Sequence, residues 1–231
     1  MSDSGSGPEV RLLRHTQDAE MLCAAAAHSC YSDRSAQELI DSLDRERAER
    51  ILDKVLGMGH HSVIEHASYT FSLEGVSRSL THQLVRHRLA SYSQQSQRYV
   101  SLDRAAYVTP PSVAADESLL ARYREIMERI WEGYRELADR VPVEDARYLL
   151  PNACRTNITV TMNARELWHL FTLRCCNRAQ WEIREVADRM LLLVREVSPL
   201  IFKRAGPPCV RGPCPEGEMG CGEPREDLKK G

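Results

Sequence analysis

Residues 86–98 read Arg-His-Arg-Leu-Ala-Ser-Tyr-Ser-Gln-Gln-Ser-Gln-Arg, which gathers three arginines, one histidine, three serines and three glutamines in one short window. The planar guanidinium of arginine fits the oxygens of a phosphate, and hydroxyl and amide groups add neutral hydrogen bonds that orient a nucleotide. The alternative is a solvated helix face followed by a polar turn, which is the commoner arrangement for a charged run. Composition alone favours that alternative, so the spacing of these residues has to decide.

The length and charge of the chain limit the classes of protein to consider. Its 231 residues can bury a sizeable core and favour one or two domains. The 31 basic residues face 33 acidic ones, so the global excess of Lys and Arg typical of a nucleic-acid-binding protein is missing. No run of about 18 apolar residues occurs, and Met1–Pro8 is unlike a signal peptide. We therefore expect a cytoplasmic protein that binds neither nucleic acid nor membrane.

Hydrophobic spacing predicts a mixture of helices and strands. Apolar residues recur at helical intervals over 17–27, 35–56, 80–85, 116–140, 163–173 and 179–197. Ser35 and Asn163 are expected to cap two of these helices, Asn163 as part of a capping box with Glu166. Alternating apolar and polar residues predict strands over 69–73 and 156–162. A short helix is expected after Pro142, and a loop after Arg88.

The sequence also predicts how the chain is divided. Residues 1–205 are expected to form one domain, and residues 206–231 an irregular tail rich in cysteine, proline and glycine. No Gly-x-Gly-x-x-Gly lies between a predicted strand and helix, and no Walker phosphate loop occurs, so a Rossmann domain is not supported. A bound dinucleotide would therefore be held by side chains and helix ends, a role that clustered arginines can fill.

The eight cysteines do not indicate a small secreted disulfide scaffold. Cys23, Cys30 and Cys154 stand among apolar residues and are expected to be small buried side chains. The others could approach one another and bind zinc or an iron–sulfur cluster, but no compact Cys-x-x-Cys supports that. We therefore predict that no metal binds here and that these cysteines are free thiols or disulfides: Cys175, Cys176, Cys209, Cys214 and Cys221.

The spacing within 86–98 resembles a known signature. Arg-His-Arg, seven residues, Ser96, one residue and Arg98 closely match the signature of the flavin-dependent thymidylate synthases. The resemblance covers most of the chain between about residues 20 and 200, including His60–Glu65, Arg147 and Asn163–Ile183. It implies an α/β fold of the α+β type, an antiparallel sheet with packed helices. It also implies FAD as cofactor and a homotetramer with flavin sites made from several subunits.

The resemblance assigns site residues position by position. Arg174 is the expected catalytic residue, since it matches the arginine that polarises the uracil ring, whereas Glu65 is expected to be structural. Taken alone, Arg165 could simply pair with a carboxylate. Contacts to dUMP are expected from Gln83, Arg86, Gln94, Ser96, Gln97, Arg98, Arg147 and Arg174. Contacts to FAD are expected from His60, Ser62, Arg86, His87, Arg88, Gln94, Asn163, Arg165 and His169.

Two departures from the family pattern concern contacts to flavin or nucleotide. The family commonly has Asn-Glu where this chain has Ser93-Gln94, and often asparagine where His169 stands. Glutamine keeps the length and the acceptor of glutamate but loses its charge.

The reaction implied by the resemblance is the reductive methylation of dUMP to dTMP. Methylenetetrahydrofolate would give the carbon unit, reduced FAD the hydride, and NADPH the electrons that reduce the flavin again. Ser96 is not expected to be a nucleophile, because no activating histidine and carboxylate are legible beside it. Two alternatives stay open: a flavin-dependent uracil methyltransferase acting on RNA, which should carry more positive charge, and a non-enzymatic nucleotide-binding module.

Overall fold

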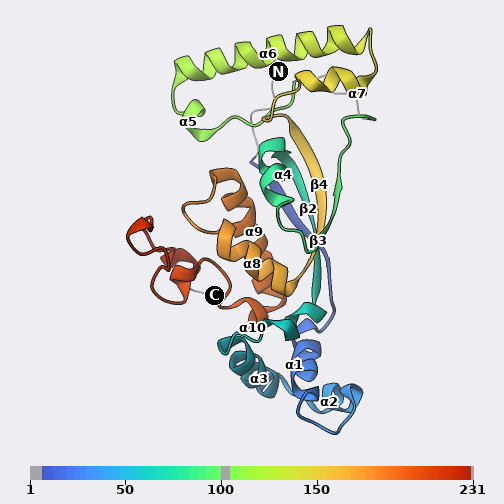
Figure 1. The fold of residues 1–231 in the computed structure, drawn as a ribbon, viewed down its shortest axis with the longest axis vertical. Coiled ribbons are helices and arrows are strands. Elements are labelled where there is room, and N and C mark those ends of the chain that lie inside the picture. The colour runs from blue at the N-terminus through green and yellow to red at the C-terminus, as the bar shows by residue number, and fades with distance from the viewer. Residues whose placement is uncertain (1–6, 100–104, 230–231) are drawn as a thin grey trace. The chain divides into compact units, whose positions relative to one another are not determined.

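A four-stranded antiparallel sheet runs through the structure, a computed structural model that describes residues 7–99 and 105–229 (Figure 1). Its order is β1-β2-β4-β3, where β1 is Glu9–His15, β2 Ser68–Ser77, β4 Arg155–Asn163 and β3 Ala90–Gln94. Every second residue is buried along β4, and along β2 as far as Leu73, as in Tyr69, Phe71 and Leu73. The predicted α+β fold is confirmed.

The two edge strands of the sheet were not predicted. The loop expected after Arg88 is wrong for most of its length, because Ala90–Gln94 forms β3. Its serines and glutamines are exposed or only half buried, so the strand carries no apolar alternation that a sequence pattern could reveal. Strand β1 is exposed along most of its length, and it escapes detection for the same reason.

The chain divides into two compact units. One takes its residues from Met1–Glu9, Leu73–Arg86 and Ser93–Thr159, and the other from Val10–Ser72, His87–Tyr92 and Val160–Gly231.

The first unit holds its core under one long helix. Its helices are α4 (Arg78–Leu84), α5 (Pro111–Ala114), α6 (Glu117–Ala138), α7 (Val143–Ala146) and the 3-10 turn η2 (Arg147–Leu149). Asp116 caps α6 by accepting from the backbone N–H groups of Ser118 and Leu119. Helix α6 buries Met127, Trp131 and Tyr134 with Ala146 and Cys154, whereas Leu119, Ile126 and Leu137 of the same predicted apolar stripe are exposed.

The second unit contains most of the helices. These are α1 (Ala19–Ser29), α2 (Ala36–Ser42), α3 (Arg45–Gly57), η1 (His61–His66), α8 (Ala164–Arg174), α9 (Trp181–Val197) and α10 (Pro199–Phe202). Phe202 packs edge-on against Tyr69 and Phe171, at ring-centroid distances of 5.3 and 6.0 Å. The Tyr69 hydroxyl is 2.8 Å from the Ser198 hydroxyl, which gives the buried phenol its polar partner.

The single helix predicted over 35–56 is wrong, because the chain breaks at Leu43. Leu43 is extended, with φ −83° and ψ 133°. Asp44 then starts α3 as its N-cap, and its side chain accepts from Arg47 N at 2.7 Å. An aspartate cap inside an otherwise periodic stretch is a start signal that competes with continuation of the helix.

The tail after Ala205 is irregular, apart from short 3-10 turns at Pro208–Val210, Gly217–Met219 and Glu226–Leu228. Buried contacts nevertheless fix it. Arg195 of α9 donates to the carbonyl oxygens of Phe202, Ala205 and Leu228 at 3.2, 3.0 and 2.9 Å. Within the described ranges, no helix is long and apolar enough to span a membrane.

Candidate functional site

A cavity of about 940 Å³ opens within the second unit. It lies between the end of α3, the start of η1, helix α8 and the first residues of the tail. A flavin dinucleotide is within the size range of ligands that such cavities hold. The lining consists of Leu56, Gly57, Gly59, His61, Leu89, Arg165, Glu166, Trp168, His169, Thr172, Arg204, Val210 and Arg211.

Two of the residues predicted to contact flavin, Arg165 and His169, line this cavity from one face of α8. Arg165 also pairs with Glu65, so the carboxylate partner considered in its ordinary interpretation exists. Both partners are substantially exposed, and such a pair adds little stability. Arg165 can therefore exchange this contact for a ligand in the cavity at small cost.

The histidine segment before η1 is placed differently from the expectation. His61 lines the cavity, whereas the predicted residues His60 and Ser62 are exposed and are not part of its lining. His61 packs against Trp168 at a ring-centroid distance of 4.9 Å. The sequence offers two adjacent histidines, and only the 3-10 turn decides which of them faces inward.

Asn163, another residue predicted to contact flavin, caps helix α8. Its side-chain oxygen accepts from Glu166 N at 2.9 Å, which is one half of the predicted capping box. The Glu166 carboxylate does not return the bond. It is buried and turns toward His87.

His87 of the Arg-His-Arg stretch is buried, with 3% of its surface exposed. Its Nε2 accepts a hydrogen bond from Arg174 Nε at 3.2 Å. An accepting Nε2 leaves the ring proton on Nδ1, which lies 3.4 Å from Glu166 Oε1 without forming a well-aligned hydrogen bond. Burial, with the nearby Arg174 and His169, lowers the pKa of His87 to about 4. His87 is therefore a neutral acceptor beside Glu166 and does not form an ion pair with it.

The contact from His87 orients Arg174, the predicted catalytic residue. Arg174 closes the last turn of α8, where a cation complements the helix dipole. Burial lowers the pKa of Arg174, yet a guanidinium stays charged at neutral pH. His87 also meets the ring of His169 edge-on at 5.5 Å. The contact that the structure gives to His87 is thus to Arg174, and its contact to flavin stays a prediction.

We expect the free energy of unfolding to fall by about 2 kcal/mol between pH 7 and pH 5 because of His87. Its folded-state pKa of about 4 lies below its usual value of 6.5, so the unfolded chain takes up the proton first and stability is lost as the pH falls. Urea unfolding of the wild type and of His87→Gln at both pH values measures this contribution of His87. The variant is a matched control because it lacks only the imidazole of His87 and keeps the other titrating groups. Among them is Glu166, whose pKa is raised by burial. Equal pH dependence in both proteins would contradict the assignment.

Three of the residues predicted to contact nucleotide meet in the first unit. Arg98 Nε is 3.0 Å from Glu144 Oε2, and Arg147 Nε donates to the Glu144 carbonyl at 3.0 Å. The Ser96 hydroxyl accepts from Arg98 N at 3.1 Å. Glu144, which the sequence did not single out, therefore brings Ser96, Arg98 and Arg147 together.

The glutamines predicted to contact nucleotide have protein partners. Gln94 Nε2 donates to the hydroxyls of Thr81 and Thr156 at 3.1 and 3.4 Å. Gln97 Nε2 donates to the Cys154 sulfur at 3.4 Å. Gln83 is exposed near the end of α4.

The outer arginines of the Arg-His-Arg stretch are both exposed. Neither the Arg86 nor the Arg88 side chain has a polar partner among the described residues. Arg86 follows α4 in the first unit, and Arg88 belongs to the second. Both guanidiniums are thus available to bind an anion.

Arg78, at the start of α4, is a half-buried cation that sequence reasoning missed. Its Nη2 donates to the Gln95 carbonyl at 3.0 Å, whereas its Nε is buried with no partner among the described atoms. Burial lowers the pKa of Arg78, to which the nearby Arg147 contributes. No motif marks this arginine in the sequence.

The cysteines are placed partly as predicted. Cys23 and Cys154 are buried, but Cys30 is exposed, so the expectation for Cys30 is wrong. Cys30 lies just beyond the last turn of α1, as its C-cap residue. All eight thiols are free. Within the described part of the chain, no three side chains of the metal-binding types are arranged to hold an ion, although one cavity of about 180 Å³ is lined by Cys176, Cys209, Cys214 and Cys221.

Comparison with known proteins identifies the family. The family described as "Thymidylate synthase complementing protein" matches residues 11–200. A flavin-dependent thymidylate synthase of Geobacter sulfurreducens is 53% identical over 221 residues, 94% of this chain and 95% of that protein. One of Clostridium tetani is 47% identical over 241 residues, 97% and 96% of the two chains.

A solved structure shares the fold. The UMP/dUMP methylase PolB from Streptomyces cacaoi, bound with 5-Br dUMP, superposes with a TM-score of 0.75 and 23% identity, over 86% of this chain and 94% of that one. The long sequence match identifies the family, and the shared fold is consistent with it. The chain therefore belongs to the thymidylate synthase complementing protein family and is an enzyme related to the flavin-dependent thymidylate synthases.

Proposed function

We propose that this enzyme converts dUMP to dTMP with methylenetetrahydrofolate as carbon donor, and with FAD that is reduced by NADPH. The observation that carries the proposal is Arg174, a guanidinium held by neutral His87 at the end of a helix whose face lines a large cavity. The relatives named flavin-dependent thymidylate synthase, and the neighbour solved with 5-Br dUMP, support the same chemistry.

The residues present fit a flavin. The cavity is dinucleotide-sized and combines apolar walls with cationic side chains, among them Arg165 and His169. Bound FAD would supply the hydride. Of the predicted contacts, Arg165 and His169 would hold it in this cavity, joined by His61, which the sequence did not predict. The contacts to flavin predicted for the residues outside the cavity lining stay predictions: His60, Ser62, Arg86, His87, Arg88, Gln94 and Asn163.

A nucleotide would be bound mainly by the arginines of the first unit. Arg98 pairs with the carboxylate of Glu144, which a phosphate could replace, and Arg147 is tied to the backbone carbonyl of the same residue. Arg86 would add a third guanidinium, and neutral contacts would come from Gln83, Gln94, Ser96 and Gln97. These residues bind and orient the base, so they supply proximity without taking part in bond chemistry.

Arg174 would act on the pyrimidine ring. Negative charge grows on a ring carbonyl oxygen as hydride arrives at the base, and a fixed guanidinium stabilises that charge as an oxyanion hole does. The hydrogen bond to His87 fixes the guanidinium before the reaction begins. No reorganisation is then needed as the charge develops, which is why such donors are effective.

The purified protein tests the proposal directly. We expect a yellow protein with the absorbance bands of oxidised flavin, which NADPH bleaches and which dUMP with methylenetetrahydrofolate restores, with release of dTMP. Uracil-containing RNA replaces dUMP in a parallel reaction. Methylation of RNA alone would favour the RNA methyltransferase, and nucleotide binding without flavin would favour the non-enzymatic module.

The proposal includes a cytoplasmic homotetramer. It is supported by the exposed guanidiniums of Arg86 and Arg88, which have no partner among the described residues and could be completed by groups from another subunit. Light scattering during size-exclusion chromatography should give a mass of about four chains. The single domain over 1–205 also remains a prediction.

Arg88 and Arg147 are expected to bind different ligands. Arg88→Ala should weaken flavin retention, whereas Arg147→Ala should mainly raise the dUMP concentration needed for half-maximal rate, each by about tenfold or more for a lost charged hydrogen bond. Flavin absorbance after gel filtration and initial rates against dUMP measure the two effects. Release of flavin by Arg147→Ala with normal dUMP dependence would contradict the assignment.

A further inference from the structure

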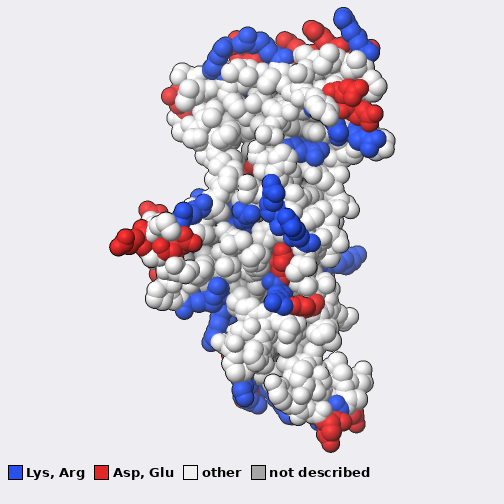
Figure 2. All heavy atoms as spheres, in the orientation of Figure 1, with Lys and Arg blue, Asp and Glu red and all other residues white. Residues whose placement is uncertain are grey.

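The charges that line the large cavity are unbalanced. Five of its lining side chains are cationic or can become so, whereas Glu166 is the only carboxylate among the described residues that line it. Burial raises the pKa of Glu166, so this carboxylate is a weak counter-charge. The five side chains are those of His61, Arg165, His169, Arg204 and Arg211. Figure 2, in which Lys and Arg are blue, shows basic side chains over α8 and α9 on the face in view.

The guanidiniums of Arg204 and Arg211 have N–H donors that no described residue accepts from. Arg211 Nη1 donates to the carbonyl oxygens of Arg204 and Gly206 at 2.8 and 2.9 Å, which fixes the guanidinium. Its Cζ lies 5.3 Å from the centre of the Trp168 ring. Arg211 Nε and Nη2, and the whole Arg204 guanidinium, have no polar partner among the described residues. A guanidinium that is held on one edge and unpaired on the other is prepared to bind an anion.

The cationic groups lie close enough to influence one another. His61 packs against the same Trp168 ring that Arg211 faces. Its pKa is lowered mainly by burial, and also by the charges of Arg165 and Arg211. His61 and Arg211 therefore flank the Trp168 ring, and an anion bound there would be attracted by the charges of Arg165 and Arg211 that act on His61.

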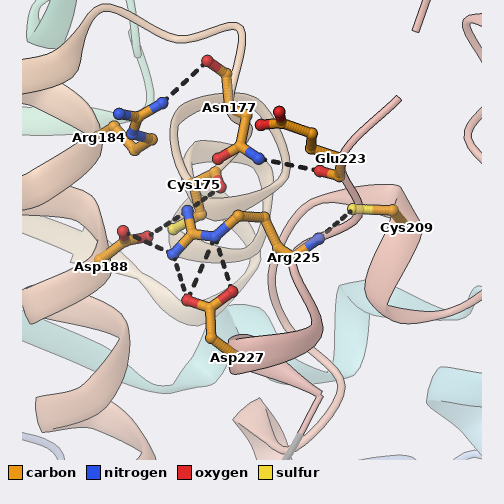
Figure 3. Close-up of polar contacts among 8 residues, drawn as sticks. All are labelled: Cys175, Asn177, Arg184, Asp188, Cys209, Glu223, Arg225 and Asp227. Carbon is orange, nitrogen blue, oxygen red and sulfur yellow. Dashed lines mark hydrogen bonds and ion pairs between the residues drawn. The ribbon is translucent and has the colours of Figure 1, made fainter. Parts of the chain in front are cut away.

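The tail that carries Arg211 is fastened by Arg225 (Figure 3). Arg225 Nη1 donates to the Cys175 carbonyl at 2.7 Å, and Nη2 lies 2.9 Å from Asp188 Oδ2 and 2.7 Å from Asp227 Oδ2. Only 11% of the Arg225 side chain and 23% of that of Asp188 are exposed, so the pair between them is shielded from water. The contacts join the tail to the end of α8 and to α9, and they limit where Arg211 can lie.

We propose that the tail completes an anion-binding subsite of the large cavity, in which Arg204 and Arg211 bind a phosphate or carboxylate group of the ligand held there. This inference rests on the proposed function for the identity of that ligand. The shared chemistry is an anion recognised by a planar guanidinium fork. Its source is either the pyrophosphate of the flavin dinucleotide or the glutamyl carboxylates of the folate.

The test compares Arg211→Ala and Arg204→Ala with the wild type, and with Arg129→Ala as a control. Arg129 is an exposed arginine of α6 that pairs with Glu125 and does not line the cavity. Dissociation constants are measured for FAD against riboflavin, and for triglutamyl against monoglutamyl folate. Loss of one charged hydrogen bond should weaken binding about 10- to 100-fold.

Each outcome decides between sources. A loss for FAD but not for riboflavin assigns the subsite to pyrophosphate, and a loss for triglutamyl but not for monoglutamyl folate assigns it to carboxylates. Arg211→Lys, which keeps the charge but not the fork, should recover part of the affinity. Unchanged affinities for all four ligands in correctly folded Arg211→Ala and Arg204→Ala would overturn the inference.

The inference and the proposed function fail in different ways. If the wild type binds neither FAD nor folate, the proposed function is wrong, and inorganic pyrophosphate and triglutamate then serve as the probes. Binding of either anion that Arg211→Ala abolishes would still support the subsite, and absence of both would overturn it. Arg225→Ala provides a second variant, which should weaken binding of the same ligand because it releases the tail.

Discussion

Replacing Arg174 by alanine is expected to slow flavin oxidation by about a hundredfold or more, even at saturating dUMP. A contact that strengthens only as charge develops in the transition state cannot be restored by more substrate. His87→Gln should show a smaller loss, since it leaves the guanidinium in place but removes the imidazole acceptor that orients it. Rapid-mixing measurements of flavin absorbance with dUMP and methylenetetrahydrofolate follow this half reaction.

Ser96→Ala is the matched control for this experiment. The Ser96 hydroxyl accepts from a neighbouring backbone N–H, so its removal should weaken binding and leave measurable turnover. Loss of a nucleophile would instead abolish the reaction, because no covalent intermediate could form. A dead Ser96→Ala that still binds both ligands, beside a nearly normal Arg174→Ala, would overturn the proposed role of Arg174.

The largest loss of stability is expected for Arg195→Ala, about 3–5 kcal/mol in the free energy of unfolding. The residue is 9% exposed, and its guanidinium donates to three carbonyl groups, including that of Leu228 in the tail. Alanine would leave these buried acceptors without a donor and detach the tail from α9. Urea unfolding gives the difference directly.

Arg189→Ala provides a control on the same helix. Arg189 is an exposed arginine paired with Glu185 one turn away, and its removal should change the free energy of unfolding by about 0.5 kcal/mol at most. An equally small effect of Arg195→Ala would show that water replaces its contacts, and that the tail is held by other groups.

The central elements of the fold were predictable because packing imposes a period on their sequences. The stripe of α6 and the alternation around Tyr69 both place large apolar residues toward a core. Strands β1 and β3 lie at the edges of the sheet, and backbone pairing places them without help from an apolar face. The break at Leu43 was missed because the periodic pattern continues through it, and only the cap at Asp44 marks the start of α3.

The sequence predicted site residues through a signature, and it failed where three-dimensional placement decides. Arg165 and His169 both reach the cavity because residues four apart lie on the same face of a helix. Choosing His61 over His60 requires knowledge of the turn. Arg204 and Arg211 have no signature, because the chain brings them to the cavity only through its irregular path after α10.

The uneven burial of the thiols gives the protein its own chemical reporters. The thiolate is the nucleophile that attacks an alkylating reagent, and exposed Cys30, Cys214 and Cys221 should therefore be modified in the native state. Burial raises the pKa of Cys23 to about 12, and that of Cys175 far above its usual value where it meets Asp188. Alkylation of Cys175 would therefore report that the tail has opened, and alkylation of Cys23 that the helices around α1 have come apart.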